Sequence, residues 1–253
     1  MLGVGSSNGR AVDPQRIAWV FGILFLLTWV TAIGARVLFE PVYSSPSSVL
    51  DAGAETGVYL GAVFEFLLIV TQIGTAVVLY PIAKWHSEIG AVGYVTARIM
   101  ESAFALVGLL SILTIVTMRQ DLAGAAGADA ASLVALGTSL TATYDWAFLF
   151  GPGLVAGVGN GLILGYVMYR SRLVPRRLAM IGLVGGSLHI IGFLCVLFGA
   201  FDADSGLRFL SSVGEMVWEA ALPVYAIWKG FKPSAIPSSE MRQVETDPAL
   251  SAA

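Results

Sequence analysis

Six ionisable side chains lie inside long apolar stretches of this sequence, where a charge is costly. In the middle of a membrane-spanning helix, a charged side chain that faces lipid costs at least ~2.5–3.5 kcal/mol. We therefore expect the six to meet in one interior cluster. Such a cluster can bind a cation or another small ligand, or it can relay protons. Its predicted members are Glu65, Arg98, Glu101, His189, Glu215 and Glu219.

Helical spacing places several of these residues on shared faces. Arg98 and Glu101 are three positions apart, and Glu215 and Glu219 are four apart, so each pair lies on one side of its helix. From the rise per residue of a helix, all six lie within roughly 10 Å of the predicted membrane midplane. We expect Arg98 to pair with Glu101 and with carboxylates of the second and sixth apolar runs.

The expected cluster carries more negative than positive charge. Four carboxylates accompany one guanidinium, and His189 can be neutral or charged. Full ionisation would leave two or three negative charges uncompensated in a low-dielectric interior. Either some carboxyl groups are protonated or a cation completes the site. For His189 by itself, an interior hydrogen-bonded histidine is the simpler interpretation.

The composition indicates a membrane protein. Hydrophobic residues make up 57% of the 253 residues and charged residues only 12%, and the mean hydropathy is +0.80. Six apolar runs approach or exceed the ~20 residues that a helix needs to cross a bilayer. They cover residues 17–39, 58–83, 91–118, 141–168, 178–200 and 208–228.

These runs predict an all-α, polytopic membrane protein with six transmembrane helices and both termini in the cytoplasm. In this orientation ten Lys and Arg residues lie inside and three outside, as the positive-inside rule favours. Residues 1–16 would form a cytoplasmic tail and residues 17–230 a single transmembrane domain. The polar residues 231–253 would form a disordered cytoplasmic tail.

Glycine repeats predict how the fourth and fifth helices pack. Small residues four positions apart form a stripe along which a neighbouring helix can approach closely. In the fourth run this stripe consists of Gly153, Gly157, Gly161 and Gly165. The fifth run follows after the short connection RSRLVPRR and has glycines on one face at Gly182, Gly185 and Gly192. We expect the two helices to be antiparallel partners.

The segments between the helices favour further assignments. The connection between the fourth and fifth helices is basic, which sets the topology and favours contact with anionic lipids at the cytoplasmic face. On the outer side, the Ala-rich residues 119–137 predict a short helix on the membrane surface. Pro152 and Pro223 would break the fourth and sixth helices. The arginines that would contact lipid are Arg170, Arg172, Arg176 and Arg177.

The sequence lacks the motifs of several well-known enzyme and metal-binding families. It contains no P-loop, no H-E-x-x-H and no C-x-x-C. One histidine at depth is too few for a haem or a histidine-rich metal centre, so we expect no cofactor, and a carboxylate-bound metal stays an open alternative. The expected partners are the lipid bilayer and its anionic lipids, with a homo-oligomer or another membrane protein as further alternatives. Nucleic acid is not expected.

Four segments together resemble a known family. They are FEFLLIVTQIGTAVVLYPI, ARIMESAFA, NGLILGYVMYRSRLVPRRLAMIGLVGG and EMVWEAALPVYAIWKGF. Their order resembles the bacterial membrane family catalogued as domain of unknown function 4386, over roughly residues 10 to 232. The resemblance implies a multi-pass protein of the bacterial inner membrane without an established activity. The family's recurring polar positions correspond here to Glu65, Arg98 with Glu101, and Glu215 or Glu219, and His189 is not among them.

Two functions of different kinds fit these observations. The first is a cation- or proton-linked transporter or small-ligand carrier whose buried carboxylates bind the cation. The alternative is a non-catalytic membrane module, such as a partner subunit or a lipid-binding or stress-sensing protein, in which the cluster is structural. An intramembrane enzyme is the least favoured. A cavity that reaches the cluster would favour the first function, and a sealed cluster would favour the second.

Overall fold

The computed structural model describes residues 13–43, 55–122 and 128–232, and all regular structure in these ranges is helical. The all-α fold that the apolar runs predict is therefore confirmed. In chain order the elements are α1 (Pro14–Tyr43), α2 (Thr56–His86), α3 (Glu88–Leu122), α4 (Ala128–Phe150), the π-helical segments η2 (Gly151–Val155) and η3 (Gly157–Leu164), α5 (Gly165–Ser171), α6 (Arg176–Leu197) and α7 (Gly206–Lys229).

Five helical segments of the described ranges are long and apolar enough to cross a membrane. They are Pro14–Tyr43, Thr56–His86, Glu88–Asp121, Ala130–Ser171 and Arg176–Leu197. Large apolar side chains such as Val37 and Phe66 are more than half exposed on their outer faces, which suits contact with lipid. The sixth predicted span, α7, has 24 residues but is less apolar, because it contains Arg208, Glu215 and Glu219.

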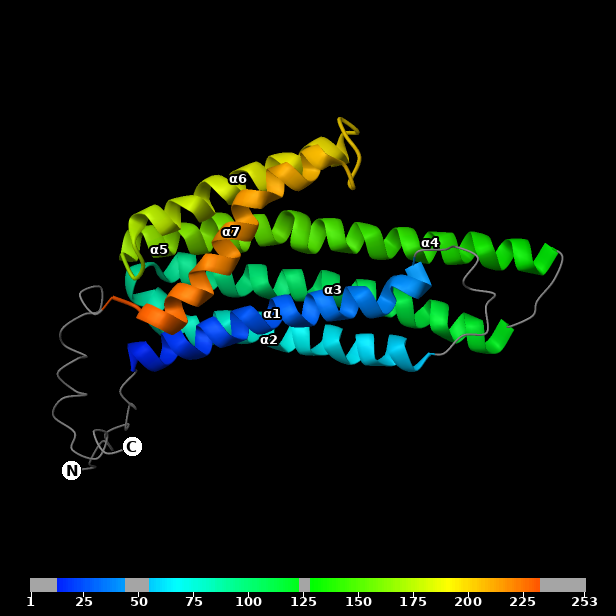
Figure 1. Ribbon diagram of the computed structural model, residues 1–253, viewed down its shortest axis with the longest axis horizontal. Helices are drawn as coiled ribbons and strands as arrows, with labels where there is room; N and C mark the ends of the chain where they lie inside the picture. Colours follow the sequence, from blue (N-terminus) through cyan, green and yellow to red (C-terminus); the bar gives the residue numbers. More distant parts are fainter. Residues whose placement is uncertain (1–12, 44–54, 123–127, 233–253) are drawn as a thin grey trace, which may run out of the picture.

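The first and last described helices meet at one end of the bundle (Figure 1). Gln15 Nε2, in the first turn of α1, donates a hydrogen bond to the carbonyl oxygen of Phe231 at 2.9 Å. Just after α7, the Lys232 amide donates to the carbonyl oxygen of Leu173, in the α5–α6 connection, at 3.0 Å. We call this the basic end, because it also holds four exposed arginines, Arg170, Arg172, Arg176 and Arg177.

Two apolar clusters hold the bundle together on either side of its middle. Phe21 and Leu79 belong to the cluster nearer the basic end, and Phe39 and Val58 belong to the other. On α2, the residues from 65 to 72 lie between Val58 of one cluster and Leu79 of the other. The buried polar side chains Gln72, Arg98 and Glu101 belong to this middle layer.

The fourth span is one long rod that runs from α4 through η2 and η3 into α5 (Figure 1). The rod begins at Ala128, so the expected surface helix across residues 119–137 is wrong. Residues 119–122 belong to the end of α3, and residues 128–137 begin α4. Alanine has the highest helix propensity, and the Ala-rich residues from 128 onward lengthen the fourth span. Pro152 does not break the rod either, because the backbone passes it in the wider π-helical form. Pro223 likewise lies inside an unbroken α7.

Most of the two predicted tails lies outside the described residues, namely residues 1–12 of the first and 233–253 of the second. The predicted transmembrane domain, residues 17–230, starts within the first turn of α1 and ends just after α7. The residues just after α7, up to residue 232, lie against the α5–α6 connection, and Phe231 is fully buried there.

Candidate functional site

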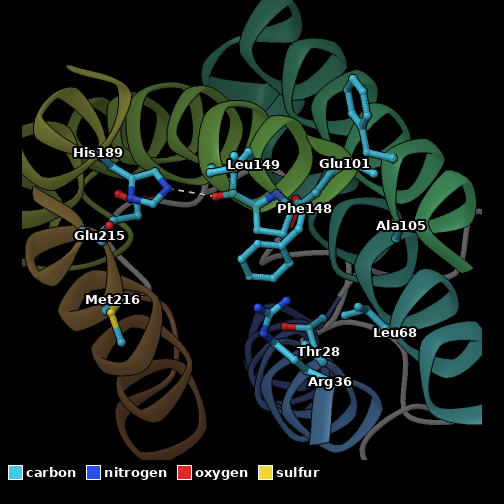
Figure 2. Close-up of a pocket in the computed structure, with 18 of the residues that line it drawn as sticks. Thr28, Arg36, Leu68, Glu101, Ala105, Phe148, Leu149, His189, Glu215 and Met216 are labelled. Carbon is cyan, nitrogen blue, oxygen red and sulfur yellow. Dashed lines mark hydrogen bonds between the residues drawn. The ribbon is translucent and has the colours of Figure 1, made fainter. Parts of the chain in front are cut away.

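A cavity of about 820 Å³ occupies the middle layer, between α1, α2, α3, the fourth span, α6 and α7 (Figure 2). Pockets that bind small molecules commonly measure ~300–1,000 Å³. The structure therefore brings the predicted cluster together around a space that is large enough for an organic ligand. The predicted residues that line it are Glu65, Arg98, Glu101, His189, Glu215 and Glu219.

One group of contacts at the site links Arg98, Glu101 and Ser102 of α3 to Gln72 of α2. Arg98 Nη1 donates to Glu101 Oε2 at 2.6 Å, and both side chains are buried. Gln72 Nε2 donates to Glu101 Oε1 at 3.0 Å, while the Ser102 hydroxyl donates to Gln72 Oε1 at 2.9 Å. Arg98 Nε adds a bond to the Gln72 carbonyl oxygen at 3.3 Å. The charge of Arg98 is thus compensated on its own helix, one turn away.

Asn160 connects this pair to α7. Its Oδ1 accepts a hydrogen bond from Arg98 Nη1 at 3.3 Å, and its Nδ2 donates to Glu219 Oε1 at 2.5 Å. Trp218 Nε1 donates to the Asn160 carbonyl oxygen at 2.9 Å, which fixes the backbone at this point. A chain of hydrogen bonds therefore runs from α3 through η3 to α7, and Glu219 belongs to it.

Glu215, one turn before Glu219, is buried and has no hydrogen-bond partner among the described residues. It is 3% exposed, and neither carboxylate oxygen accepts a hydrogen bond from any side chain or amide of the described ranges. The carboxylate lies against Gly161, where an added Cβ would come within 2.7 Å of Oε2. An ionised carboxylate in this position is unstable unless a proton or another cation accompanies it.

His189 and Arg208 form a separate contact where the fourth span meets α6 and α7. His189 Nε2 lies 2.8 Å from the carbonyl oxygen of Pro152, and Nδ1 lies 3.3 Å from Arg208 Nη1. A carbonyl oxygen can only accept and a guanidinium can only donate, so Nε2 carries the proton and Nδ1 accepts. This is a neutral histidine that orients an arginine. Arg208 Nη1 also donates to the Ser212 hydroxyl at 2.6 Å.

Glu65 lies on the α1–α2 side of the cavity, apart from Arg98. Within the described ranges, no hydrogen bond or ion pair joins the two residues. The expected pairing of Arg98 with a carboxylate of the second helix is therefore not seen. On the same side, the Arg36 guanidinium lies 5.1 Å from the ring centre of Tyr43 and 4.6 Å from that of Phe148, and Figure 2 shows it pointing into the cavity.

Polar residues outside the predicted cluster also line the cavity, among them Arg36, Asn160 and Arg208. Arg208 is 8% exposed and lies in the first turn of α7, so it is an interior residue and not part of an outer loop. The helical spacing of Arg208 is a sequence signal that could have predicted its place in the interior. The intervals of four, three and four along one face of α7 connect Arg208, Ser212, Glu215 and Glu219.

The glycine stripe of the fourth span lies against α6. A Cβ on Gly161 would be 2.5 Å from the Cα of Gly186, which means that the two backbones are in direct contact. The expected glycine face of α6 turns toward α7, because Gly182 packs under the Trp218 ring and Gly185 against Gly214. The glycines of α6 therefore pack against two helices, the fourth span and α7. The expected antiparallel pairing of the fourth and fifth spans explains only the glycines that contact the fourth span.

The polar side chains of the cavity are spread over several helices. In the described ranges, no three His, Cys, Asp or Glu residues gather closely enough to hold a metal ion. Between the carboxylates stand two amide side chains: Gln72 donates a hydrogen bond to Glu101, and Asn160 donates one to Glu219. A multi-carboxylate metal centre therefore finds no support in this geometry.

Comparison with protein families gives a match over most of the chain. The matching family model is described as Domain of unknown function (DUF4386) and covers residues 20–230. No curated protein and no solved structure matches the chain.

Proposed function

The chain belongs to the DUF4386 family, and from this premise we propose that it is a cation- or proton-linked membrane carrier that binds its ligand in the central cavity. The observation that supports this most is that the buried carboxylates line a cavity of about 820 Å³. A cluster with only a structural role has no need of such a space. Glu215 adds a second reason, because its unpartnered carboxylate requires a proton or another cation.

In this proposal the cation binds beside Glu215, and its binding changes a hydrogen bond between α7 and the fourth span. Glu219 lies one helical turn further along α7 and shares Asn160 with Arg98. Neutralising Glu215 removes a negative charge next to Glu219 and so alters how strongly Glu219 holds Asn160. The contact between α7 and α3 would then differ between the loaded and empty carrier, as transport requires.

A non-catalytic module remains the second candidate, and the hydrogen-bonded chain favours it. Arg98, Glu101, Asn160 and Glu219 each have a partner, as expected of a polar contact that only fixes the register of three helices. This candidate leaves the unpaired Glu215 and the cavity without a role.

We further propose that α7 is a sixth transmembrane helix, that residues 17–230 form one membrane domain, and that both termini are cytoplasmic. The start of α1 and the end of α7 share the basic end, which suits an even number of crossings. The exposed arginines of that end would face the cytoplasm and contact anionic lipids. The membrane would be the bacterial inner membrane, where a homo-oligomer or another membrane protein could join the chain.

Reporter fusions test this topology. A reporter that is active only in the cytoplasm, joined to the C-terminus, should give a signal, and the same reporter inserted near residue 128 should give none. The physical reason is that the excess of Lys and Arg lies at the basic end. Activity at both positions, or the reverse pattern, would contradict the proposed orientation.

Flux measurements test the carrier function. Purified protein in liposomes should carry protons or sodium ions down an imposed gradient, measured with a pH-sensitive dye and with radioactive sodium. Glu215→Gln should reduce the flux to the level of empty liposomes, since it removes the charge that draws the cation. Glu88→Gln, which removes an exposed carboxylate at the start of α3, is the matched control and should leave the flux unchanged. Wild-type protein without either flux would favour the structural module.

A further inference from the structure

The charges of the cavity are unevenly distributed along its depth. At the mouth, the end farther from the basic end, two arginines and two aspartates balance one another, namely Arg36, Arg208, Asp145 and Asp204. At the deep end, Arg98 is the cation among the described lining residues, and it is already bonded to Glu101. Glu215 and Glu219 add two further carboxylates there, whereas Glu65 lies on the side of Arg36, nearer the mouth. The deep end therefore favours a positively charged ligand.

Aromatic rings provide much of the rest of the wall. A cation within about 6 Å of a ring centre is attracted to the ring face, and the attraction grows when water is excluded. Arg98 already makes such a contact, because its guanidinium lies 5.4 Å from the centre of the Phe25 ring. Rings and carboxylates together are the usual surroundings of organic ammonium groups. The aromatic residues that line the cavity include Phe25, Trp29, Phe104, Tyr144 and Phe148.

The cavity reaches the outer surface between α1 and α7. Near the basic end these helices touch, since a Cβ on Gly22 would lie 2.8 Å from the carbonyl oxygen of Pro223. Further along, Ile33 of α1 and Phe209 of α7 both line the cavity, yet they are 58% and 62% exposed. Figure 2 shows α1 and α7 on opposite sides of the opening. This opening lies along helix faces that suit lipid, so an apolar ligand can enter from the bilayer.

We propose that the cavity binds a lipophilic organic cation, such as an amine, a quaternary ammonium or a phosphonium with an apolar body, and that its charged centre lies beside Glu215. The inference rests on the proposed carrier function and narrows its substrate class. Glu215 is the residue that distinguishes this site from a mere acidic cluster, because it is 3% exposed and both of its oxygens lack a partner in the described ranges. A monovalent cation supplies the one charge that Glu215 lacks.

Two ions of the same shape and opposite charge provide a direct test. Purified protein in lipid nanodiscs is titrated with tetraphenylphosphonium and, separately, with tetraphenylborate, and binding is measured by equilibrium dialysis against empty nanodiscs. We expect saturable binding of the phosphonium and none of the borate. Stronger binding of the borate would place an anion on Arg36 and Arg208 and would overturn the proposal. Absence of saturable phosphonium binding would overturn it too.

Variants locate the site and the entry route. Glu215→Gln should weaken phosphonium binding about 30-fold or more, because it removes one partner of a buried charge pair, and Glu88→Gln should not. Ile33→Trp, at the opening, should slow phosphonium association several-fold. Val30→Trp, on an exposed part of α1 outside the cavity lining, should leave it unchanged. Equal phosphonium affinity of wild type and Glu215→Gln would exclude the proposed site.

The outcomes separate this inference from the carrier function. Proton or sodium flux that depends on Glu215, without phosphonium binding, would retain the carrier and reject the organic cation. Phosphonium binding that depends on Glu215, without any flux, would retain the ligand class and favour a binding module. Failure of both would leave the cluster with a structural role.

Discussion

Arg98→Met is expected to give a protein that inserts into the membrane but is markedly less stable. The change removes the bonds from Arg98 to Glu101 and Asn160 and leaves Glu101 with Gln72. Breaking a buried ion pair on one side costs ~3–5 kcal/mol when the other side stays charged. Uptake of a proton by Glu101 should recover part of this loss, so the measured decrease in the free energy of unfolding should fall below that range.

Unfolding by SDS titration in mixed micelles measures this effect. Arg170→Met is the control, because Arg170 is an exposed arginine of the basic end and its loss should change stability by ~0.5 kcal/mol or less. Adding Glu101→Gln to Arg98→Met should restore part of the stability, as coupled residues do. Wild-type stability of Arg98→Met would show that the pair in α3 does not hold the middle layer together.

The second large effect is expected from Gly161→Leu. A Cβ at this position would lie 2.5 Å from the Cα of Gly186 and 2.7 Å from Glu215 Oε2. The backbone of α6 cannot move aside by changing a rotamer, so the fourth span and α6 must separate. Overpacking of a tight interior typically costs ~1–3 kcal/mol, and we expect the upper part of that range. Displacement of Glu215 should also abolish cation flux.

The melting temperature in detergent and the liposome flux together measure this prediction. Gly57→Leu is the matched control, because a Cβ on Gly57 would meet nothing within 4 Å. The double change of Gly157 and Gly161 to leucine should lower the melting temperature at least as far as the single one. Unchanged melting of both variants would show that close approach of the two backbones is not required.

Local sequence patterns were enough to predict the helical elements and the family, and they assigned the polar residues to one shared layer. Hydropathy and the helical period depend on neighbours in the chain, so they located Glu65, Glu101 and Glu215 in one layer before any contact was known. Spacing alone also brought Arg98 within reach of Glu101, because residues three apart share a helix face. The resemblance of four segments pointed to the family that the comparison then showed.

Which of these residues have hydrogen-bond partners depends on how the helices pack against one another. Helical spacing tells which side chains share a face, but the rotation and tilt of each helix against its neighbours decide what that face meets. Asn160 therefore bonds Glu219, and Arg208 turns inward to His189. Glu215 lies against Gly161, and no residue of the described ranges donates a hydrogen bond to it. Local sequence could not reveal these features, because each depends on segments that are far apart in the chain.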